Sequence, residues 1–212
     1  MTGAPVATDG RVPGRRGRAT RQRLLEATAD SLAATSWRSV TVTDIARRAG
    51  TSPATFYQYF GNVEQAISVL AEDLVEDGVG LAELVGGEWS PAASWATSQA
   101  LCRGFLDYWE ANRSLFYVLD LAADLDTPLA GVRVRALRAL TMALAAAVAS
   151  HGSAAADHPV AVAVSLVAML ASVARRRAAL SALGVPANDL FDSEARLVHF
   201  AVTGRPGPAA GG

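Results

Sequence analysis

Lysine is absent from the 212 residues, so arginine carries every positive side-chain charge. Guanidinium groups suit bidentate and phosphate contacts, but we attribute this composition mainly to the coding bias of a GC-rich genome. Cysteine occurs once, as Cys102, which excludes an intramolecular disulfide framework and fits a reducing cytoplasm. The first twenty residues contain arginines but no apolar segment after them, so we expect no targeting signal.

Catalytic and metal-binding patterns are also missing. His151, His158 and His199 stand at no metal-ligand spacing, and the chain has no G-x-S-x-G, phosphate loop or CxxC. We therefore expect no enzyme activity, no cofactor and no metal. The longest apolar run, residues 159–174, is shorter than the roughly 20 residues that a membrane span needs. It predicts a buried helix at a core or subunit seam, and no membrane partner.

Charge is distributed unevenly along the chain, although the formal net charge is only -1. Residues 1–60 hold nine arginines against four acidic residues, which gives +5. Residues 61–212 hold ten arginines against sixteen acidic residues, which gives -6. A basic front end on an acidic body predicts a polyanionic partner for the front end only.

No alternating strand pattern appears, whereas apolar residues recur at spacings of three and four along much of the chain. The sequence therefore predicts an all-α protein. Residues 1–18, rich in Gly, Pro and Arg, are expected to form a flexible basic arm, and the pattern loosens near residues 78–91. Apart from the helices of residues 41–75, helices are expected at about 20–36, 94–111, 113–125, 128–150, 157–182 and 190–203.

Two short helices around one glycine are predicted within residues 41–60. Thr43 is expected to cap the first helix, which begins at Asp44 with an acidic side chain at the positive end of the helix dipole. Gly50 is expected to end it.

A second start signal follows at the pair Ser52–Pro53, in which the serine caps the helix and the proline is its first residue. Phe56 and Phe60, four residues apart, form the predicted buried face of this helix. Asn62 and Gln65 have the spacing of a capping box and predict the start of a third, longer helix.

The second short helix carries uncharged polar side chains where a surface helix commonly carries charge. Ala54, Thr55, Tyr57, Gln58 and Tyr59 remain outward when the phenylalanines face inward. Hydroxyl groups can donate to phosphate oxygens, and an amide can read a base edge in the major groove. The pattern is typical of a helix-turn-helix unit. The alternative is a helical hairpin that serves only for packing or for binding another protein.

The sequence also carries a recurring signature, "T-V-x-x-I-A-x-x-A-G-x-S-x-x-T-F-Y-x-Y-F", followed by a short cap and a glutamate. Residues 20–75 resemble the DNA-binding domain of the TetR family of transcriptional regulators, in which this signature is found. The matching residues are Thr41, Val42, Ile45, Ala46, Ala49, Gly50, Ser52, Thr55, Phe56, Tyr57, Tyr59, Phe60, Asn62 and Glu64.

The resemblance implies roles for individual residues. Tyr57 and Tyr59 would contact phosphates, and Thr43 and Ser52 would anchor the starts of their helices on the DNA backbone. Val63 stands where family members commonly have a lysine that contacts phosphate. The full set of expected DNA contacts is Arg18, Arg21, Thr43, Arg47, Ser52, Pro53, Ala54, Thr55, Tyr57, Gln58, Tyr59 and Asn62.

The body carries an aromatic stripe, because Trp95, Cys102 and Trp109 are seven residues apart and share one helix face. Such a stripe either belongs to the core or lines an apolar ligand pocket. The family resemblance implies a pocket in this body and favours a small, largely apolar effector. The candidate residues are Trp95, Cys102, Phe105, Trp109, Phe116, Tyr117, Met142 and Met169.

Together these observations predict a cytoplasmic, ligand-responsive repressor that binds a palindromic DNA operator as a dimer. By resemblance, the last two long helices, which carry Ala161, Ser165, Ala168 and Ser172, would form a seam with a second subunit. The expected divisions are a basic arm (1–18), a helix-turn-helix domain (19–65), a helical ligand-binding and dimerisation domain (66–204) and a disordered tail (205–212).

Overall fold

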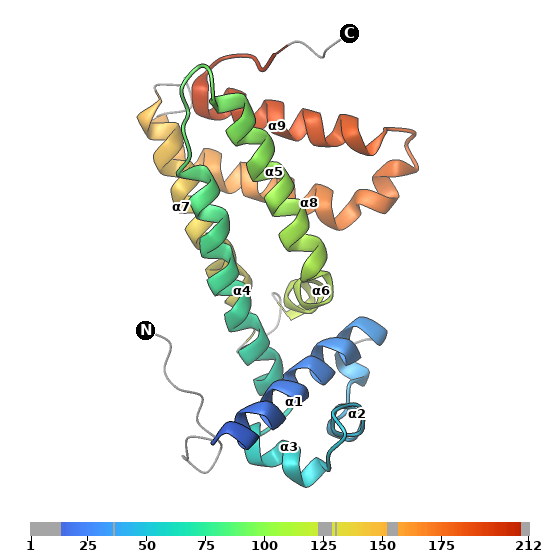
Figure 1. The fold of residues 1–212 in the computed structure, drawn as a ribbon. Coiled ribbons are helices and arrows are strands. Elements are labelled where there is room, and N and C mark those ends of the chain that lie inside the picture. The colour runs from blue at the N-terminus through green and yellow to red at the C-terminus, as the bar shows by residue number, and fades with distance from the viewer. Residues whose placement is uncertain (1–13, 36, 123–128, 130, 152–156, 209–212) are drawn as a thin grey trace. The chain divides into compact units, whose positions relative to one another are not determined.

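The computed structural model describes residues 14–35, 37–122, 129, 131–151 and 157–208. These residues form nine α-helices and one short 3-10 helix, with no strand among them, as Figure 1 shows. The all-α prediction is therefore confirmed. The elements are α1 (Arg15–Ala34), η1 (Trp37–Ser39), α2 (Val42–Arg48), α3 (Pro53–Tyr59), α4 (Val63–Val85), α5 (Ser94–Ala111), α6 (Arg113–Ala122), α7 (Val132–Ser150), α8 (Pro159–Ser181) and α9 (Ala187–Thr203).

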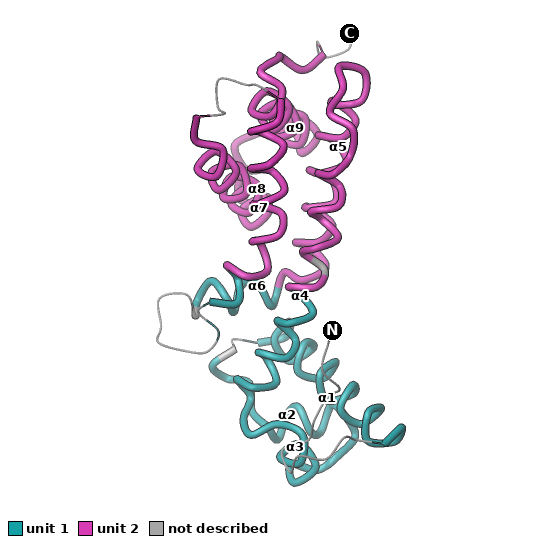
Figure 2. Tube along the Cα trace, turned by 90° about the vertical axis from the view of Figure 1, so that its left-hand side faces the viewer, with its two compact units in different colours: residues 1–74, 114–133 teal, residues 75–113, 134–212 magenta. Residues whose placement is uncertain are grey.

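The chain divides into two compact units, which Figure 2 shows in separate colours. Unit 1 comprises Met1–Leu74 and Ser114–Arg133, and unit 2 comprises Val75–Arg113 and Val134–Gly212. Unit 1 therefore contains α1 to α3 together with most of α6, and α4 runs from one unit into the other. Of the segments named from sequence, the part of the basic arm before residue 14, residues 123–128 and 130, and residues 209–212 of the expected tail lie outside the described residues.

Helix α1 begins earlier than the periodicity predicted. It starts at Arg15, after Gly14 in extended backbone, so residues 15–18 of the expected flexible arm are helical. Thr20 lies inside the helix, where its hydroxyl donates to the backbone oxygen of Arg16 at 3.1 Å. Arginine is a good helix former even without an apolar face, and this explains why hydrophobic spacing alone missed the first turn.

The expected loosening at residues 78–91 is wrong for its first half, because α4 continues to Val85. Glycine at position 78 has a packing role there. A Cβ atom on Gly78 would overlap the backbone oxygen of Ala136 in α7, so the missing side chain lets the two helices approach closely. The glycine that suggests a helix break in the sequence therefore supports helix packing in the fold.

The core of unit 2 lies where α5, α8 and α9 pack against one another. Phe105 and Trp109 of α5 are buried and their rings stack, with centroids 6.4 Å apart. Helix α8 is long and apolar enough to cross a membrane by length and composition alone, a test that the core helix of a soluble protein also passes. Its buried residues are Ala163, Leu166, Val167, Leu170, Ala171 and Ala174.

Candidate DNA-binding and effector sites

The first helix of the predicted helix-turn-helix is capped by Thr41, and the expectation for Thr43 is wrong. Thr41 has extended backbone, and its Oγ1 accepts a hydrogen bond from the backbone N–H of Asp44 at 3.2 Å. The same hydroxyl donates to the Asp44 carboxylate at 2.7 Å. Thr43 lies inside α2 with an exposed side chain. The cap stands three residues before the acidic side chain, which is the spacing of a capping box.

Asp44 also holds Arg47, one of the expected phosphate contacts. The carboxylate Oδ1 and guanidinium Nη2 atoms are 3.1 Å apart, one turn apart on the exposed face of α2. The hydrogen bond from Thr41 and that from Arg47 lower the pKa of the Asp44 carboxyl below its ordinary value. The charge of Arg47 is thus partly balanced within its own helix.

The turn between α2 and α3 depends on Gly50, whose φ of +64° lies in the left-handed region that glycine adopts most easily. Ser52 then caps α3 as predicted, since its Oγ accepts from the backbone N–H of Thr55 at 3.2 Å. Pro53 is the first residue of α3, also as predicted.

Helix α3 is anchored by two phenylalanines. Phe56 and Phe60 are buried, with ring centroids 5.4 Å apart, which confirms the predicted buried face. Arg21 of α1, another expected DNA contact, is half-buried and places its guanidinium 5.5 Å from the centroid of the Phe60 ring. Arg18 is exposed on α1.

The opposite side of α3 is open to solvent. Tyr57 is 53% exposed, and Pro53, Ala54 and Gln58 are also exposed. Thr55 and Tyr59 are half-buried. The outward set therefore combines an amide, hydroxyls and small side chains without a charged group, on a helix whose orientation is fixed by buried rings.

The start of α4 is held by a reciprocal pair of hydrogen bonds. Asn62 Oδ1 accepts from the backbone N–H of Gln65 at 2.7 Å, and Gln65 Oε1 accepts from the backbone N–H of Gly61 at 2.5 Å. The predicted capping interaction is thus present, although the glutamine reaches one residue further back than in a standard capping box. This fixes the connection between α3 and α4.

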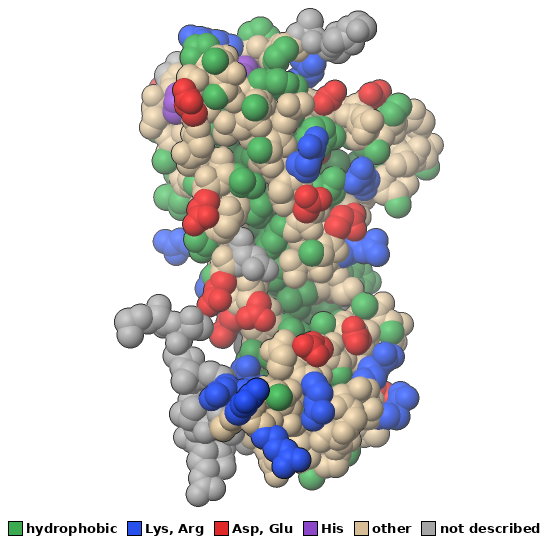
Figure 3. All heavy atoms as spheres, in the orientation of Figure 1, with side chains coloured by type: hydrophobic (Ala, Val, Ile, Leu, Met, Phe, Trp, Pro, Cys, Tyr) green, Lys and Arg blue, Asp and Glu red, His purple; other side chains and the backbone are tan. Residues whose placement is uncertain are grey.

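Sequence reasoning missed Arg38 of η1. Figure 3 shows arginine side chains gathered on the visible face of unit 1, over α1 and its neighbours. Arg38 is exposed and lines an open hollow with Tyr57 and Asn62. The signal in the sequence was an arginine between two helices, close to the signature. Nothing in its spacing indicated that it would lie beside the second short helix.

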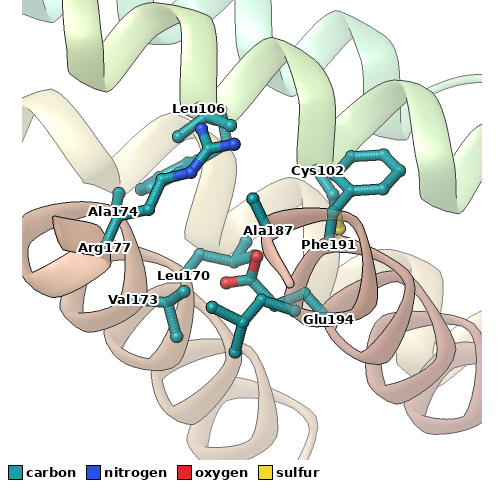
Figure 4. Close-up of a pocket in the computed structure, with 11 residues that line it drawn as sticks. Cys102, Leu106, Leu170, Val173, Ala174, Arg177, Ala187, Phe191 and Glu194 are labelled. Carbon is teal, nitrogen blue, oxygen red and sulfur yellow. The ribbon is translucent and has the colours of Figure 1, made fainter. Parts of the chain in front are cut away.

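A second candidate site is a narrow cavity in unit 2, between α5, α8 and α9 (Figure 4). Its volume is about 20 Å³, enough for a single water molecule. It contains Cys102 and Phe105 from the eight residues expected to contact an effector. The lining residues are Cys102, Phe105, Leu106, Leu170, Val173, Ala174, Arg177, Ala187, Leu190, Phe191 and Glu194.

The other six expected effector contacts do not line this cavity. Trp109 and Phe116 are buried, in unit 2 and unit 1 respectively. Tyr117 and Met142 are 57% and 51% exposed. Two further residues are half-buried, Met169 on α8 and Trp95 on α5, where Arg196 lies 5.2 Å from the Trp95 ring centroid.

Two groups that line the cavity, Glu194 and Cys102, have shifted pKa values. Burial raises the pKa of the Glu194 carboxyl to about 7, although the positive charge of Arg177 acts in the opposite direction. Burial, with the negative charge of Glu194, raises the pKa of the Cys102 thiol to about 12. Since thiolate is the reactive form, this raised pKa disfavours reaction at Cys102. Figure 4 shows the Glu194 carboxylate between the helices, with Arg177 extending from α8 toward Leu106.

Comparison with known families identifies both parts of the chain. A family model described as bacterial regulatory proteins, tetR family, matches residues 24–65. A second model, described as the tetracyclin repressor-like C-terminal domain, matches residues 81–209. No curated protein gave a significant sequence match.

Solved structures share this fold at low sequence identity. A transcriptional regulator from Rhodococcus sp. RHA1 has a TM-score of 0.65 at 20% identity, covering 87% of this chain and 96% of its own. FadR from Bacillus subtilis, in complex with stearoyl-CoA, has a TM-score of 0.61 at 15% identity, with coverage of 87% and 98%. Mycobacterium smegmatis AmtR has a TM-score of 0.58 at 22% identity, with coverage of 92% and 100%.

The two family models together span the helix-turn-helix and most of the helical body. The signature of residues 41–60, the capped helices and the outward polar face of α3 agree with that match. The chain belongs to the TetR family of transcriptional regulators.

Proposed function

We propose that the protein is a cytoplasmic, ligand-responsive repressor that binds a palindromic operator as a homodimer. The observation that carries the proposal is the division of α3 into a buried aromatic side and an exposed, uncharged, hydrogen-bonding side. Because its exposed side carries no charged group, such a helix can enter the major groove and form hydrogen bonds with base edges without electrostatic repulsion from the flanking phosphates.

Roles on α3 follow from the chemistry of its exposed groups. Tyr57 and Tyr59 would donate hydrogen bonds from their hydroxyl groups to phosphate oxygens. These contacts would position the helix-turn-helix domain of each subunit, called the head below, without distinguishing one base sequence from another. Gln58 would pair with a base edge, and the methyl groups of Ala54 and Thr55 would meet a thymine methyl. Pro53 would also face the bases, and Thr43 and Ser52 would contact the DNA backbone at the helix starts. Asn62 would flank this surface, while Arg18, Arg21 and Arg47 would supply positive charge.

Dimerisation is supported by an apolar stripe on α8 and α9. Val160 and Val164 of α8 are exposed one turn apart, and Leu197 and Phe200 of α9 are exposed at matching helical spacing. Exposed large apolar side chains one turn apart on a helix favour an interaction surface. One α3 makes few base contacts, each worth about 1–3 kcal/mol, so two heads on a two-fold site give useful selectivity.

Effector binding is proposed in the body, near the cavity between α5, α8 and α9. Its lining is mostly apolar, and the structural neighbour FadR binds a ligand with a long acyl chain. Ligand pockets commonly have volumes of about 300–1,000 Å³, so an effector would have to displace α9 from α5 and α8. Such a displacement would bias the spacing of the two heads and release DNA. An effector that saturates the body without changing DNA affinity would contradict this coupling.

Salt titration tests DNA binding against the alternative of a protein interaction module. Neutralising several phosphates makes affinity fall by orders of magnitude between about 50 and 200 mM salt. A contact through apolar protein surface would barely respond. Binding-site selection on random duplexes should then return an inverted repeat, and recovery of no preferred sequence would contradict the operator proposal.

A further inference from the structure

An open hollow in unit 1 adjoins the exposed tyrosine of α3. Its volume is about 610 Å³, and it is bordered by η1, the start of α2, the side of α3 and the start of α4. Four consecutive elements of the chain thus present side chains to one space. The lining residues are Arg38, Val40, Val42, Tyr57, Asn62, Val63 and Glu64.

The positive charge in the lining of this hollow comes from one arginine, Arg38. Arg38 and Glu64 are the charged residues among the seven, so the lining has a formal charge of zero with Arg38 and of -1 without it. Arg38 is exposed, whereas Glu64 is half-buried. An anion entering from solvent would therefore meet the guanidinium more readily than the carboxylate. Tyr57 and Asn62 add a hydroxyl and an amide that can donate hydrogen bonds.

Arg47 does not line this hollow, and its guanidinium lies 3.1 Å from the Asp44 carboxylate. Arg38 shares its hollow with Tyr57, the residue that the proposed function places against the DNA backbone.

We propose that this hollow receives a backbone phosphate of duplex DNA, with Arg38 supplying the positive charge and Tyr57 a hydroxyl donor. The inference rests on the proposed DNA-binding function and adds the cation that binds the strand beside α3. Guanidinium and phosphate form strong, charge-assisted hydrogen bonds. Val63 borders the same hollow, so a lysine introduced there would place a second cation in reach of the same phosphate.

The test uses a fluorescently labelled duplex of random sequence, which needs no knowledge of the operator. Anisotropy titrations over a range of salt concentrations give the slope of log affinity against log salt. The proteins compared are the wild type, Arg38→Gln, the double variant Arg38→Gln/Val63→Lys, and the control Arg138→Gln. Arg138 is exposed on α7 in unit 2. Thermal unfolding by circular dichroism establishes that each variant is folded.

We expect Arg38→Gln to reduce the slope by about 0.9 for each head that touches the duplex. The double variant should regain most of that slope, and Arg138→Gln should match the wild type. An unchanged slope in Arg38→Gln overturns the inference. A double variant that stays as weak as Arg38→Gln also overturns it, because a cation in the hollow then has no effect. Failure of the wild type to bind the duplex would instead refute the proposed function itself.

Discussion

The hydroxyl of Ser94, in the first turn of α5, lies 3.0 Å from Nε2 of His199, near the end of α9. Nδ1 of the same ring lies 3.0 Å from the backbone oxygen of Arg205. A carbonyl oxygen only accepts, so Nδ1 carries a hydrogen atom, and in the tautomer protonated at Nδ1 alone Nε2 accepts from Ser94. A single buried imidazole therefore joins the start of α5 to the segment that follows α9.

Ser94→Ala should destabilise the protein by about 1–3 kcal/mol, because it leaves Nε2 of a buried ring without its partner. Urea unfolding followed by circular dichroism measures the change. Ser150→Ala is the matched control, since the exposed hydroxyl of Ser150 bonds within its own helix to Ala146. Equal unfolding midpoints for the two variants would show that the link between Ser94 and His199 adds no stability.

Thr41→Ala should cost about 1 kcal/mol, the usual loss when a side chain that caps a helix is removed. Thr43→Ala serves as its control, because Thr43 is exposed inside α2 and does not cap it. The change for Thr43→Ala should stay within about 0.5 kcal/mol. A larger loss for Thr43→Ala than for Thr41→Ala, in the same unfolding assay, would contradict the capping geometry.

These helix starts show how far local sequence patterns can be taken. Ser52, Phe56 and Phe60 were placed correctly because capping and four-residue spacing are properties of a single helix. Two threonines precede Asp44, and choosing between them requires the three-residue spacing of the cap as well as its residue type. The loosening expected from residue 78 was wrong because Gly78 serves close packing against a neighbouring helix, α7, which the local pattern does not contain.

The cavity proposed for the effector was harder to predict for the same physical reason. Cys102, from the aromatic stripe on α5, and Phe105 beside it line the cavity, but the opposite walls come from α8 and α9. Arg177 and Glu194 belong to no common sequence motif, and they line the same cavity only because α8 and α9 pack together. Exposed residues such as Tyr117 and Met142 looked suitable by type alone, although each lies mostly in solvent.

Tyr57→Phe and Gln58→Ala should affect DNA binding in different ways. Loss of a hydroxyl that contacts phosphate should weaken binding to all sequences alike, whereas loss of an amide that reads a base should relax preference at one base pair by about 1–3 kcal/mol. Binding-site selection with each variant measures the two profiles. Identical profiles for both variants would show that these roles are assigned incorrectly.

Glu194→Gln should stabilise the protein more at high pH than at low pH. The folded pKa is raised from 4.5 to about 7, so the folded state binds more protons than the unfolded state between these values. Wild-type stability from this group is complete below pH 4.5 and is lost as the pH rises through about 7. The glutamine variant avoids that loss. Above pH 7 we expect its free energy of unfolding to exceed that of the wild type by about 1 kcal/mol, a figure reduced for solvent screening of the half-buried carboxyl.

Urea unfolding at pH 5 and pH 8 measures this dependence for the wild type and for Glu194→Gln. Glu83→Gln, which changes an exposed carboxylate on α4, provides the control for general charge effects. The stability difference between wild type and Glu194→Gln should widen from pH 5 to pH 8. A difference that stays constant would mean that Glu194 has no unusual titration in the folded protein.

Phe200→Arg should disrupt the proposed homodimer. Phe200 is 56% exposed on α9, and a second subunit covering it would bury an arginine without a partner in the variant. Leu183→Arg is the control, because Leu183 lies beyond the end of α8 and is 74% exposed. Sedimentation velocity should find a dimer for the wild type and the control, and a monomer for Phe200→Arg. Because a monomer presents a single α3, its salt-dependent affinity for the selected inverted repeat should also fall. A dimer that persists with arginine at position 200 would exclude this stripe as the subunit interface.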